Sequence, residues 1–506
     1  MNLGRLGELA GCICMQTGNN DDMPDQSAEA TQRTQQILRR SAELIAGGKP
    51  KEAVDLCQAF LRQNSGEPKI YFALAVGLAQ CGRRDESAAA YRQAIRLWPA
   101  FYEARMNLGT LLSSTGQFEH AIAELSQAAQ LRPQAAEAYI NLSDAHRAMW
   151  RIDSAIENAE RAISLNPAIP EGHNCLGAAL ASKGEFDRAI AEYRQAITLR
   201  SDYPAAHLNL GLALLVTGNL GEGFSHYEWR TRCDIAETPR RFSRPSWTGQ
   251  NLQNKTILLY PEQGFGDAIH FIRYAPLIAQ MGAKIWLESP AELYRLFASI
   301  PSIERMFAPG KTPVEYDFHC PLPALPHAFK TTLDSIPGNV PYLVADPADI
   351  KRWRKRIDRA PDYLQIGLAW SGNAANRNER NRSVPLAKFS PLARNGKRCF
   401  HSLQIAPPPP EAGISLLDWS SQLIDFTDTA ALIANLDLII TVDTAVAHLA
   451  GAMGKKVWLL LSDPPDWRWM LDRADTPWYP TMRLFRQQTR GDWDSVIASL
   501  PIESQF

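Results

Sequence analysis

The sequence has almost no surplus of charge of either sign. Its 506 residues include 53 Lys and Arg and 54 Asp and Glu, a formal net charge of −1. Binding to nucleic acid or to anionic membranes normally needs a basic surplus, so neither partner is predicted. The sequence also lacks an apolar run approaching the roughly 18 residues of a membrane span, so no transmembrane segment is expected. At roughly 150 residues per domain, the length predicts three or slightly more domains.

Closely paired cysteines are also scarce. The eight cysteines are scattered, with Cys12 and Cys14 as the one near pair and no Cys-x-x-Cys. Zinc sites need paired ligands at short spacing, so no metal site is predicted. A disulfide framework is not expected in a chain of this size, which predicts a reducing, cytoplasmic location.

The N-terminal segment has two interpretations. Leu9–Cys12 resembles a bacterial lipoprotein cleavage box, but Glu8 interrupts the apolar stretch and only Arg5 precedes it. A short helix with a frayed tail is therefore favoured over a signal segment. Residues 16–30 are acidic and polar, so residues 1–33 are predicted to be a partly disordered tail.

A period of 34 residues is present in the first half of the chain. Four independent sets of positions repeat with this spacing. These sets are Gly48, Gly82, Gly116, Gly184 and Gly218 with Trp150 in the missing slot; Pro99, Pro133 and Pro167; Ala121, Ala155 and Ala189; and Gly109, Ser143, Gly177 and Gly211. Glycine fits a tight turn, small residues allow two helices to approach closely, and proline ends a helix. The period therefore predicts pairs of antiparallel helices.

This is the tetratricopeptide pattern. Five units are predicted from about 68 to 237 and a less regular one near 34–67, so residues 34–237 are assigned to repeats. Such units stack into an all-α superhelix whose concave face binds peptides or proteins. A purely architectural solenoid, which spaces or dimerises the rest of the chain, remains the alternative.

The second half has an α/β pattern after a connector at 238–253. Short apolar runs alternate with helical stretches, which predicts two Rossmann-like domains, 254–345 and 346–506, separated by a proline-rich segment. Predicted strands are Thr256–Tyr260, Lys284–Glu288, Gln365–Trp370, Phe400–Gln404, Asp437–Asp443 and Val457–Leu461, and predicted helices include His270–Gln280, one from Ala291, Ile350–Ile357, 429–435 and 444–453. Ligands of such domains bind at the carboxyl ends of the strands.

The loop after the first of these strands contains Gly264-x-Gly266 followed by Asp267. A dinucleotide fingerprint requires a small residue where Ile269 stands, although Glu288 lies at a suitable distance for a ribose contact. A nicotinamide or flavin site therefore stays an alternative, although one position of the fingerprint is not matched. Asp267 is suited to cap the following helix and also to take a proton from an attacking hydroxyl, and the two roles are compatible.

A second candidate site follows the strand that ends at Asp443. Thr444 opens a helix of small residues, and its hydroxyl, with the amides of Ala445 and Val446, is suited to bind a diphosphate without a metal. His448 lies one turn later on the same face. It is equally well explained as a packed histidine.

A third candidate is the loop with Ser371, Gly372 and Asn373, which is followed by Arg377, Arg380, Arg382 and Ser383. Arginine matches phosphate bidentately, although a solvated charged loop is the plainer interpretation. Asp492-Trp493-Asp494 imitates an Asp-x-Asp metal motif, but its place before the terminal helix favours capping.

Two motifs resemble the lipopolysaccharide heptosyltransferases. Gly264–His270 is similar to their Gly-Asp-x-x-His signature, and Val442–Leu449 to their donor-binding turn, within a resemblance that spans about 254–500. That family has two facing Rossmann-like domains in the GT-B arrangement. The whole chain resembles bacterial proteins that fuse tetratricopeptide repeats to such a domain, and it has the domain order of protein O-GlcNAc transferases.

The resemblance assigns roles to individual residues. It implies Asp267 as the catalytic base, with Gly264 and Gly266 in the cleft loop. The implied donor-diphosphate residues are Ser371, Arg382, Asp443, Thr444, Ala445, Val446 and His448. Ala445 stands where the family usually has glycine, and the first Rossmann-like unit is short, so heptose specificity does not follow.

The sequence thus predicts an inverting, metal-independent glycosyltransferase with no cofactor beyond its donor, a nucleotide-diphosphate sugar. The repeats are expected to hold a protein or glycan acceptor. The alternative is a non-catalytic tetratricopeptide scaffold with a degenerate sugar-nucleotide domain.

Overall fold

The computed structural model describes residues 28–233, 240, 242–313, 315–357, 363–373, 378–393, 397–409 and 413–501. The chain falls into two compact units, Met1–His207 with Arg232–Glu237, and Leu208–Thr231 with Thr238–Phe506. The predicted tail up to residue 27 lies outside the described residues, whereas Ala28 already begins a helix.

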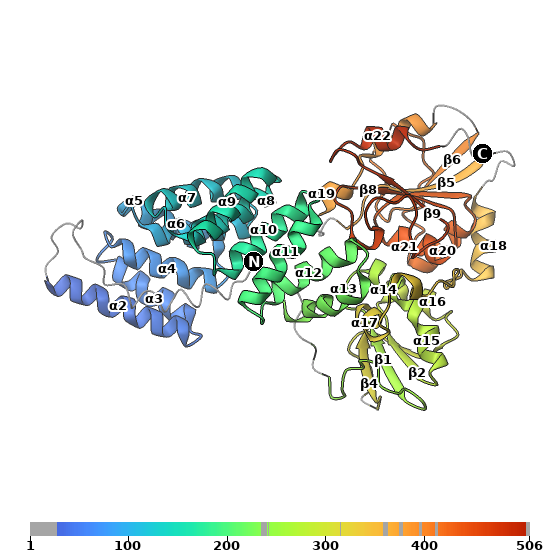
Figure 1. Ribbon diagram of the computed structural model, residues 1–506, viewed down its shortest axis with the longest axis horizontal. Helices are drawn as coiled ribbons and strands as arrows, with labels where there is room; N and C mark the ends of the chain where they lie inside the picture. The colour runs from blue at the N-terminus through green and yellow to red at the C-terminus, as the bar shows by residue number, and fades with distance from the viewer. Residues whose placement is uncertain are drawn as a thin grey trace. The chain divides into compact units, whose positions relative to one another are not determined.

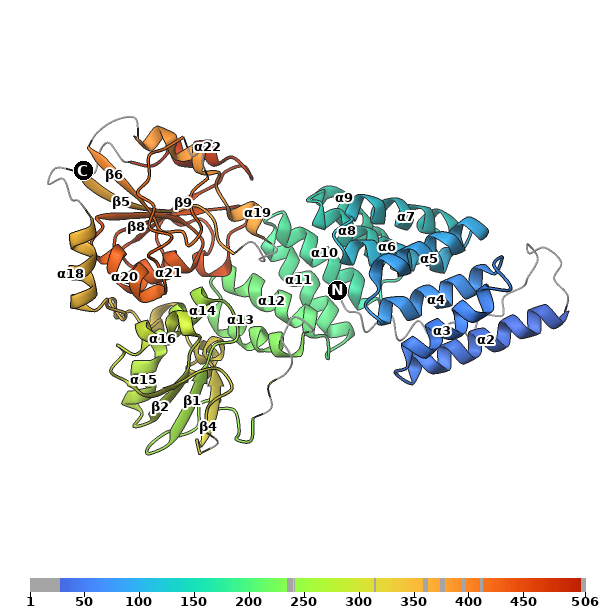
Figure 2. The same ribbon diagram turned by 180° about the vertical axis from the view of Figure 1, so that it is seen from behind.

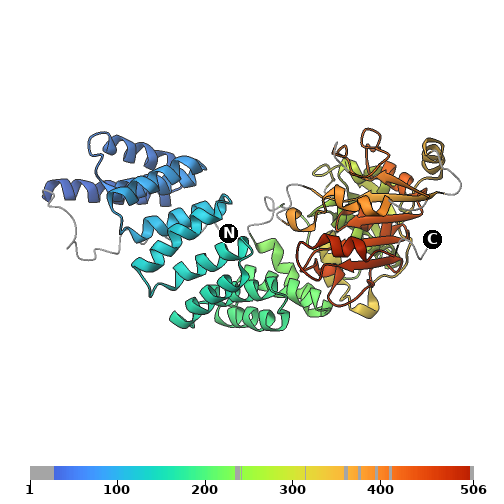
Figure 3. The same cartoon turned by 90° about the horizontal axis from the view of Figure 1, so that it is seen from above.

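The first unit is an all-α tetratricopeptide solenoid, as the period predicted. Helix pairs follow one another from blue to green in Figures 1 and 3, and each pair contacts the next. The helices are α2 (Ala28–Ala46), α3 (Pro50–Leu61), α4 (Pro68–Gln80), α5 (Arg84–Leu97), α6 (Tyr102–Ser114), α7 (Phe118–Leu131), α8 (Ala136–Ala148), α9 (Ile152–Leu165), α10 (Pro170–Ser182) and α11 (Phe186–Leu199). A last pair, α12 (Pro204–Val216) and α13 (Leu220–Tyr227), falls into the second unit from Leu208 onward.

The small residues of the repeat set how closely the paired helices approach. A Cβ on Gly109 would lie 2.5 Å from Leu125, and one on Gly177 would lie 2.7 Å from Tyr193. Ser143 fits the same register because its hydroxyl donates to the carbonyl of Ala155 at 2.8 Å. The small residues therefore repeat every 34 positions because the two helices of each pair pack closely there.

The turn between paired helices requires left-handed backbone. All six turn positions have positive φ, from 60° at Trp150 to 90° at Gly218. Glycine adopts this conformation without strain, whereas a side chain with a Cβ carries a cost of roughly 1–3 kcal/mol. Trp150 is thus the strained member of the series.

We expect Trp150→Gly to stabilise the protein by about 1 kcal/mol, because it relieves a strained residue that is 36% exposed. The free energy of unfolding in guanidinium measures this gain. Gly184→Ala, at φ 85°, is the matched opposite change and should cost a similar amount. Loss of stability in Trp150→Gly would contradict the assignment of strain.

The second unit contains two sheets, both built of parallel strands. The first lobe has the strand order β3-β2-β1-β4 and the second lobe β6-β5-β7-β8-β9. The strands are β1 (Thr256–Tyr260), β2 (Lys284–Glu288), β3 (Ile303–Phe307), β4 (Phe318–Pro321), β5 (Leu364–Ala369), β6 (Arg398–Ser402), β7 (Leu438–Val442), β8 (Val457–Leu461) and β9 (Met482–Arg486). Strands β7 and β8 are buried throughout, as expected for a sheet covered on both faces. The lobes are therefore Rossmann-like.

Helices flank both sheets and connect most of the consecutive strands (Figure 2). They are α14 (Phe265–Phe271), α15 (Ala275–Gln280), α16 (Ala291–Phe297), α17 (Leu325–Ala328), α18 (Pro347–Arg356), α19 (Glu379–Arg382), α20 (Phe426–Ala434), α21 (Ala445–Ala452) and α22 (Trp493–Ala498). The described helices include none long and apolar enough to cross a bilayer.

The helix predicted at His270–Gln280 needs correction. Helix α14 begins earlier, at Phe265, and a 3-10 turn at Ile272–Tyr274 separates it from α15. Pro276 explains the break, because proline has no N–H to donate to the carbonyl of residue 272, one helical turn earlier. Asp267 consequently lies in the first turn of a short helix of its own.

Candidate functional site

The predicted catalytic and donor motifs meet where α14 and α21 contact each other. The two helices lie side by side in Figures 1 and 2, and their contact is extensive. A Cβ on Gly266 would lie 2.9 Å from Cδ2 of His448 and 3.5 Å from Cα of Ala445. Because α14 follows β1 and α21 follows β7, the carboxyl ends of the two sheets converge at this point.

Asp267 is paired with an arginine from the other lobe. Its carboxylate accepts a hydrogen bond from Arg468 and is 21% exposed. Burial raises the pKa of Asp267, and the charge of Arg468 lowers it. The N-cap residue of α14 is Gly264, and the carboxylate of Asp267 in the first turn is hydrogen-bonded to the backbone of Gly264. Its carboxylate belongs to an ion pair between the lobes.

Arg468 was not identified from the sequence. It lies in the 3-10 turn Trp467–Trp469, is 6% exposed, and donates from Nη1 to Asp466 at 2.9 Å. Its guanidinium lies 4.3 Å from the ring centroid of Trp467. The only sequence signal was an arginine between two tryptophans in a segment that follows a buried strand.

The donor turn exposes helix amides. Thr444 is the N-cap of α21 with extended backbone, and its side chain makes no capping hydrogen bond. Among the described residues, the amides of Ala445 and Val446 donate to no protein acceptor, as is usual for the first turn of a helix. Together with the positive end of the helix dipole, they can accept an anion.

Asp443 precedes this turn and is unusually hard to ionise. Burial raises the pKa of Asp443 to about 7, and the nearby charge of Asp466 adds to the shift. Arg382 and Arg468 act in the opposite direction. A carboxyl group that is partly protonated near neutral pH can donate a hydrogen bond to a phosphate oxygen.

His448 is packed, as the plainer interpretation held. Its Nδ1 lies 2.9 Å from the hydroxyl of Tyr479, and its ring stacks on Trp469. His270 makes the same 2.9 Å contact to Tyr479. The hydroxyl of Tyr479 therefore bridges the Nδ1 atoms of the two rings. Burial lowers the pKa of both histidines well below the usual value, so both are neutral.

Arg382 lies beside the donor turn. Its Nε donates to Glu379 at 2.7 Å, and its charge acts on Asp443 and His448. Glu379 also accepts from the amide of Gly372, which fixes the loop. Arg380 is exposed to solvent, and Arg377 lies outside the described residues.

Ser371 lies near the candidate site, whereas Asp492 serves as a helix cap. The Ser371 hydroxyl accepts from Gln404, which lies two residues beyond the end of β6, so Ser371 lies at the carboxyl ends of the neighbouring strands β5 and β6. Asp492 is the N-cap of α22 and accepts from the amide of Ser495 at 3.1 Å, so the capping interpretation is confirmed.

Glu288 is not available for a ribose. It is 1% exposed, pairs with Arg240 at 2.7 Å and accepts from Thr312 at 2.6 Å. The carboxylate of Glu288 is therefore already bonded to residues of the first lobe. The ribose contact that a dinucleotide site would need from Glu288 therefore has no structural support.

The last repeat helix also belongs to the site. The hydroxyl of Tyr227 accepts from Gln263 at 2.9 Å, and Arg230 pairs with Glu262 at 2.8 Å. Phe224 packs edge-on against Trp467 at 5.5 Å. The segment therefore touches both the loop before Asp267 and the turn that holds Arg468.

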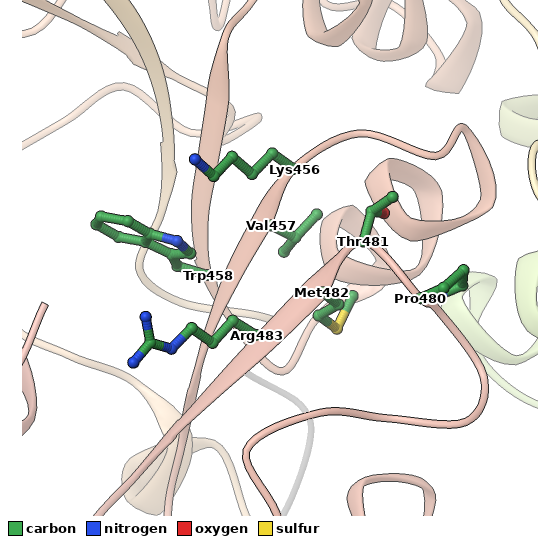
Figure 4. A pocket seen from close by; sticks show the side chains of 7 residues that line it. All are labelled: Lys456, Val457, Trp458, Pro480, Thr481, Met482 and Arg483. Atoms are coloured by element: carbon green, nitrogen blue, oxygen red, sulfur yellow. The ribbon is translucent and has the colours of Figure 1, made fainter. Parts of the chain in front are cut away.

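A small hollow lies at the opposite end of the second sheet (Figure 4). Its lining includes Lys456 and Thr481, which precede β8 and β9, and its volume is about 170 Å³. Ligand pockets usually measure about 300–1,000 Å³ and lie at the carboxyl ends of parallel strands. This hollow therefore carries no functional assignment.

We expect Gly266→Ala to weaken both stability and catalysis. The new Cβ would press on His448, which Trp469 and Tyr479 hold in place. Overpacking of this kind costs about 1–3 kcal/mol, and a 1 Å displacement at a site can cost roughly 100-fold in rate. Thermal unfolding and turnover measure the two effects. Gly264→Ala, which meets no atom within 4 Å, is the matched control, and equal effects in both variants would contradict the packing role.

Comparison with known proteins agrees with this division of the chain. Tetratricopeptide repeat models match residues 38–100, 72–136, 136–169 and 179–218. The model for glycosyltransferase family 9 (heptosyltransferase) matches residues 423–469, which include the donor turn and Arg468.

One curated relative is Protein FlbA of Caulobacter vibrioides, 25% identical over 316 residues, or 55% of this chain and 51% of FlbA. The chain thus spans about half the length of that relative. Similar solved structures include MamA of Desulfovibrio magneticus RS-1 (22% identity, 34% of this chain and 97% of MamA, TM-score 0.32) and PilF of Pseudomonas aeruginosa (18%, 41% and 94%, TM-score 0.36). The chain therefore carries tetratricopeptide repeats followed by a region similar to glycosyltransferase family 9.

Proposed function

We propose that the second unit is a glycosyltransferase of GT-B form that uses a nucleotide-diphosphate sugar. The observation that carries this proposal is the contact between α14 and α21, which brings Asp267 of one lobe to the open helix amides of the other. A base and an anion-binding helix end on facing lobes are the two groups that sugar transfer requires.

The proposed reaction is inverting and needs no metal. An acceptor hydroxyl attacks the anomeric carbon while its proton passes to Asp267. The bond between that carbon and the diphosphate oxygen breaks, and its electron pair leaves with the diphosphate. The amides of Ala445 and Val446, Arg382 and a protonated Asp443 stabilise the charge that develops. Thr444 and Ser371 would orient the donor.

The acceptor is proposed to be a protein, or a glycan carried by one, held on the repeats. The support is the direct packing of α13 against the loop before Asp267. Tetratricopeptide arrays bind polypeptides on extended surfaces, so the array and the base would act on one bound chain.

Calorimetry of the full chain against UDP-, GDP-, ADP- and CDP-sugars, with NAD⁺ as a further ligand, tests this function. We expect one class of nucleotide sugar to bind in the presence of EDTA, with no binding of NAD⁺. Failure of every nucleotide sugar to bind would favour the non-catalytic scaffold. Binding of NAD⁺ alone would favour hydride chemistry.

A further inference from the structure

Arg468 is a buried cation shared between two lobes. It donates from Nη2 to Asp267 of the first lobe and from Nη1 to Asp466 of the second. The side chain is 7% exposed, while those of Asp267 and Asp466 are 21% and 36% exposed. The guanidinium is therefore less hydrated than either carboxylate that it binds.

The guanidinium is not saturated by these partners. Nε of Arg468 is buried and donates to no acceptor in the described part of the chain. Buried polar groups in native proteins are nearly always paired, and arginine binds anions best through two adjacent N–H groups. The unpaired Nε–H indicates that this arginine has a second bonding arrangement.

The donor turn lies within reach of its charge. Arg468 acts electrostatically on both Asp443 and His448, which flank the first turn of α21. That turn is in direct contact with α14, where a Cβ on Gly266 would lie 3.5 Å from Cα of Ala445. A diphosphate at the helix amides would therefore compete with Asp267 for the same guanidinium.

Asp267 cannot serve as a base while it is paired. A carboxylate that accepts a charge-assisted hydrogen bond from a guanidinium is stabilised in its ionised form, so its capacity to take a proton is reduced. Removal of Arg468 would leave a buried carboxylate with a greater affinity for a proton, because burial favours the neutral form.

We propose that Arg468 is a catalytic residue that transfers from Asp267 to the donor diphosphate, so that donor binding releases the base. This inference rests on the proposed function of the same site. When the glycosidic bond breaks, the electron pair passes to the diphosphate and its added negative charge is balanced by Arg468. The proton of the acceptor hydroxyl passes to Asp267. The free enzyme thus keeps its base masked until a donor is present.

Titration of the full chain with UDP, GDP, ADP and CDP tests this proposal. If Asp267 and the nucleotide compete for Arg468, replacing Arg468 should weaken nucleotide binding, whereas replacing Asp267 should strengthen it. Arg468→Met should weaken binding of the preferred nucleoside diphosphate by about 10–100-fold, since a buried charge-assisted contact is lost. Asp267→Asn should tighten it by about tenfold, because the arginine is released. An ion pair that serves structure alone would weaken binding in both variants.

Two further variants keep the test decisive. Arg468→Lys preserves the charge without the bidentate guanidinium, so it should bind the nucleotide with intermediate affinity. It serves as the test variant if Arg468→Met fails to fold. Arg473→Met removes an arginine of the same segment that pairs with the exposed Asp475, and it should leave binding unchanged.

The outcomes separate the two proposals. Binding to the wild type with equal or weaker binding in Asp267→Asn would overturn the role of Arg468 and leave the proposed function standing. Absence of binding by every nucleoside diphosphate and nucleotide sugar to the wild type would overturn the proposed function, and the role of Arg468 with it.

Discussion

We expect Asp267→Asn to abolish sugar transfer while the variant continues to bind its donor. Asparagine keeps the shape of the side chain but cannot take a proton, and removal of a general base costs about 10²–10⁴-fold in rate. The exchange also releases Arg468 from its ion pair with Asp267, so donor binding is expected to be retained or tightened. Turnover with the preferred nucleotide sugar, followed by release of the nucleoside diphosphate, measures the loss.

The control for this variant is Asp492→Asn. Asp492 caps α22 through the amide of Ser495, and asparagine caps helices as well as aspartate. Its turnover should equal that of the wild type. Undiminished turnover in Asp267→Asn would remove the assignment of Asp267 as the base, whatever its pairing with Arg468.

Tyr479→Phe should be the most destabilising conservative exchange near the site. The hydroxyl of Tyr479 is the shared partner of Nδ1 in His270 and His448, at 2.9 Å from each. Both rings are buried and neutral, so loss of the hydroxyl leaves two polar atoms without partners. Each such atom costs about 1–3 kcal/mol, which predicts a total of about 2–6 kcal/mol.

Tyr274→Phe is the matched comparison. Tyr274 is equally buried, but among the described residues its hydroxyl has a single partner, the hydroxyl of Thr331 at 2.8 Å. We expect this exchange to cost about 1 kcal/mol. The unfolding transition of each variant by scanning calorimetry gives the two values. Equal losses in both would show that Tyr479 does not join the two histidines.

The repeats could be predicted from sequence because each register reflects a local requirement. The turn at Gly116 needs positive φ, and Gly109 needs space against Leu125, both within one unit of 34 residues. Trp150 shows the limit of this reasoning, because the pattern located the turn correctly although the residue is unsuited to it.

The strands of the second half were predicted where both faces are buried. The strands missed were β3, β4 and β9, at or near sheet edges, and β3 has Glu304 and Arg305 exposed. An edge strand needs no continuous apolar run, so its sequence resembles that of a loop.

The candidate site was predicted only in part, because its motifs are local and its pairings are not. Asp267 and Thr444 follow strands, so their loops could be identified from strand ends. Arg468 lies 201 residues from Asp267, and Tyr479 lies 209 residues from His270. Such partners are determined by how the two lobes pack, and no spacing in the sequence encodes them.

Hydrogen exchange of the full chain, with and without the bound nucleotide sugar, tests most directly whether the meeting point of α14 and α21 is the donor site. We predict slower exchange at the amides of Ala445 and Val446 and across Gly264–His270. The hollow around Lys456 and Thr481 should be unaffected. Protection confined to that hollow, or absent from the first turn of α21, would contradict the account.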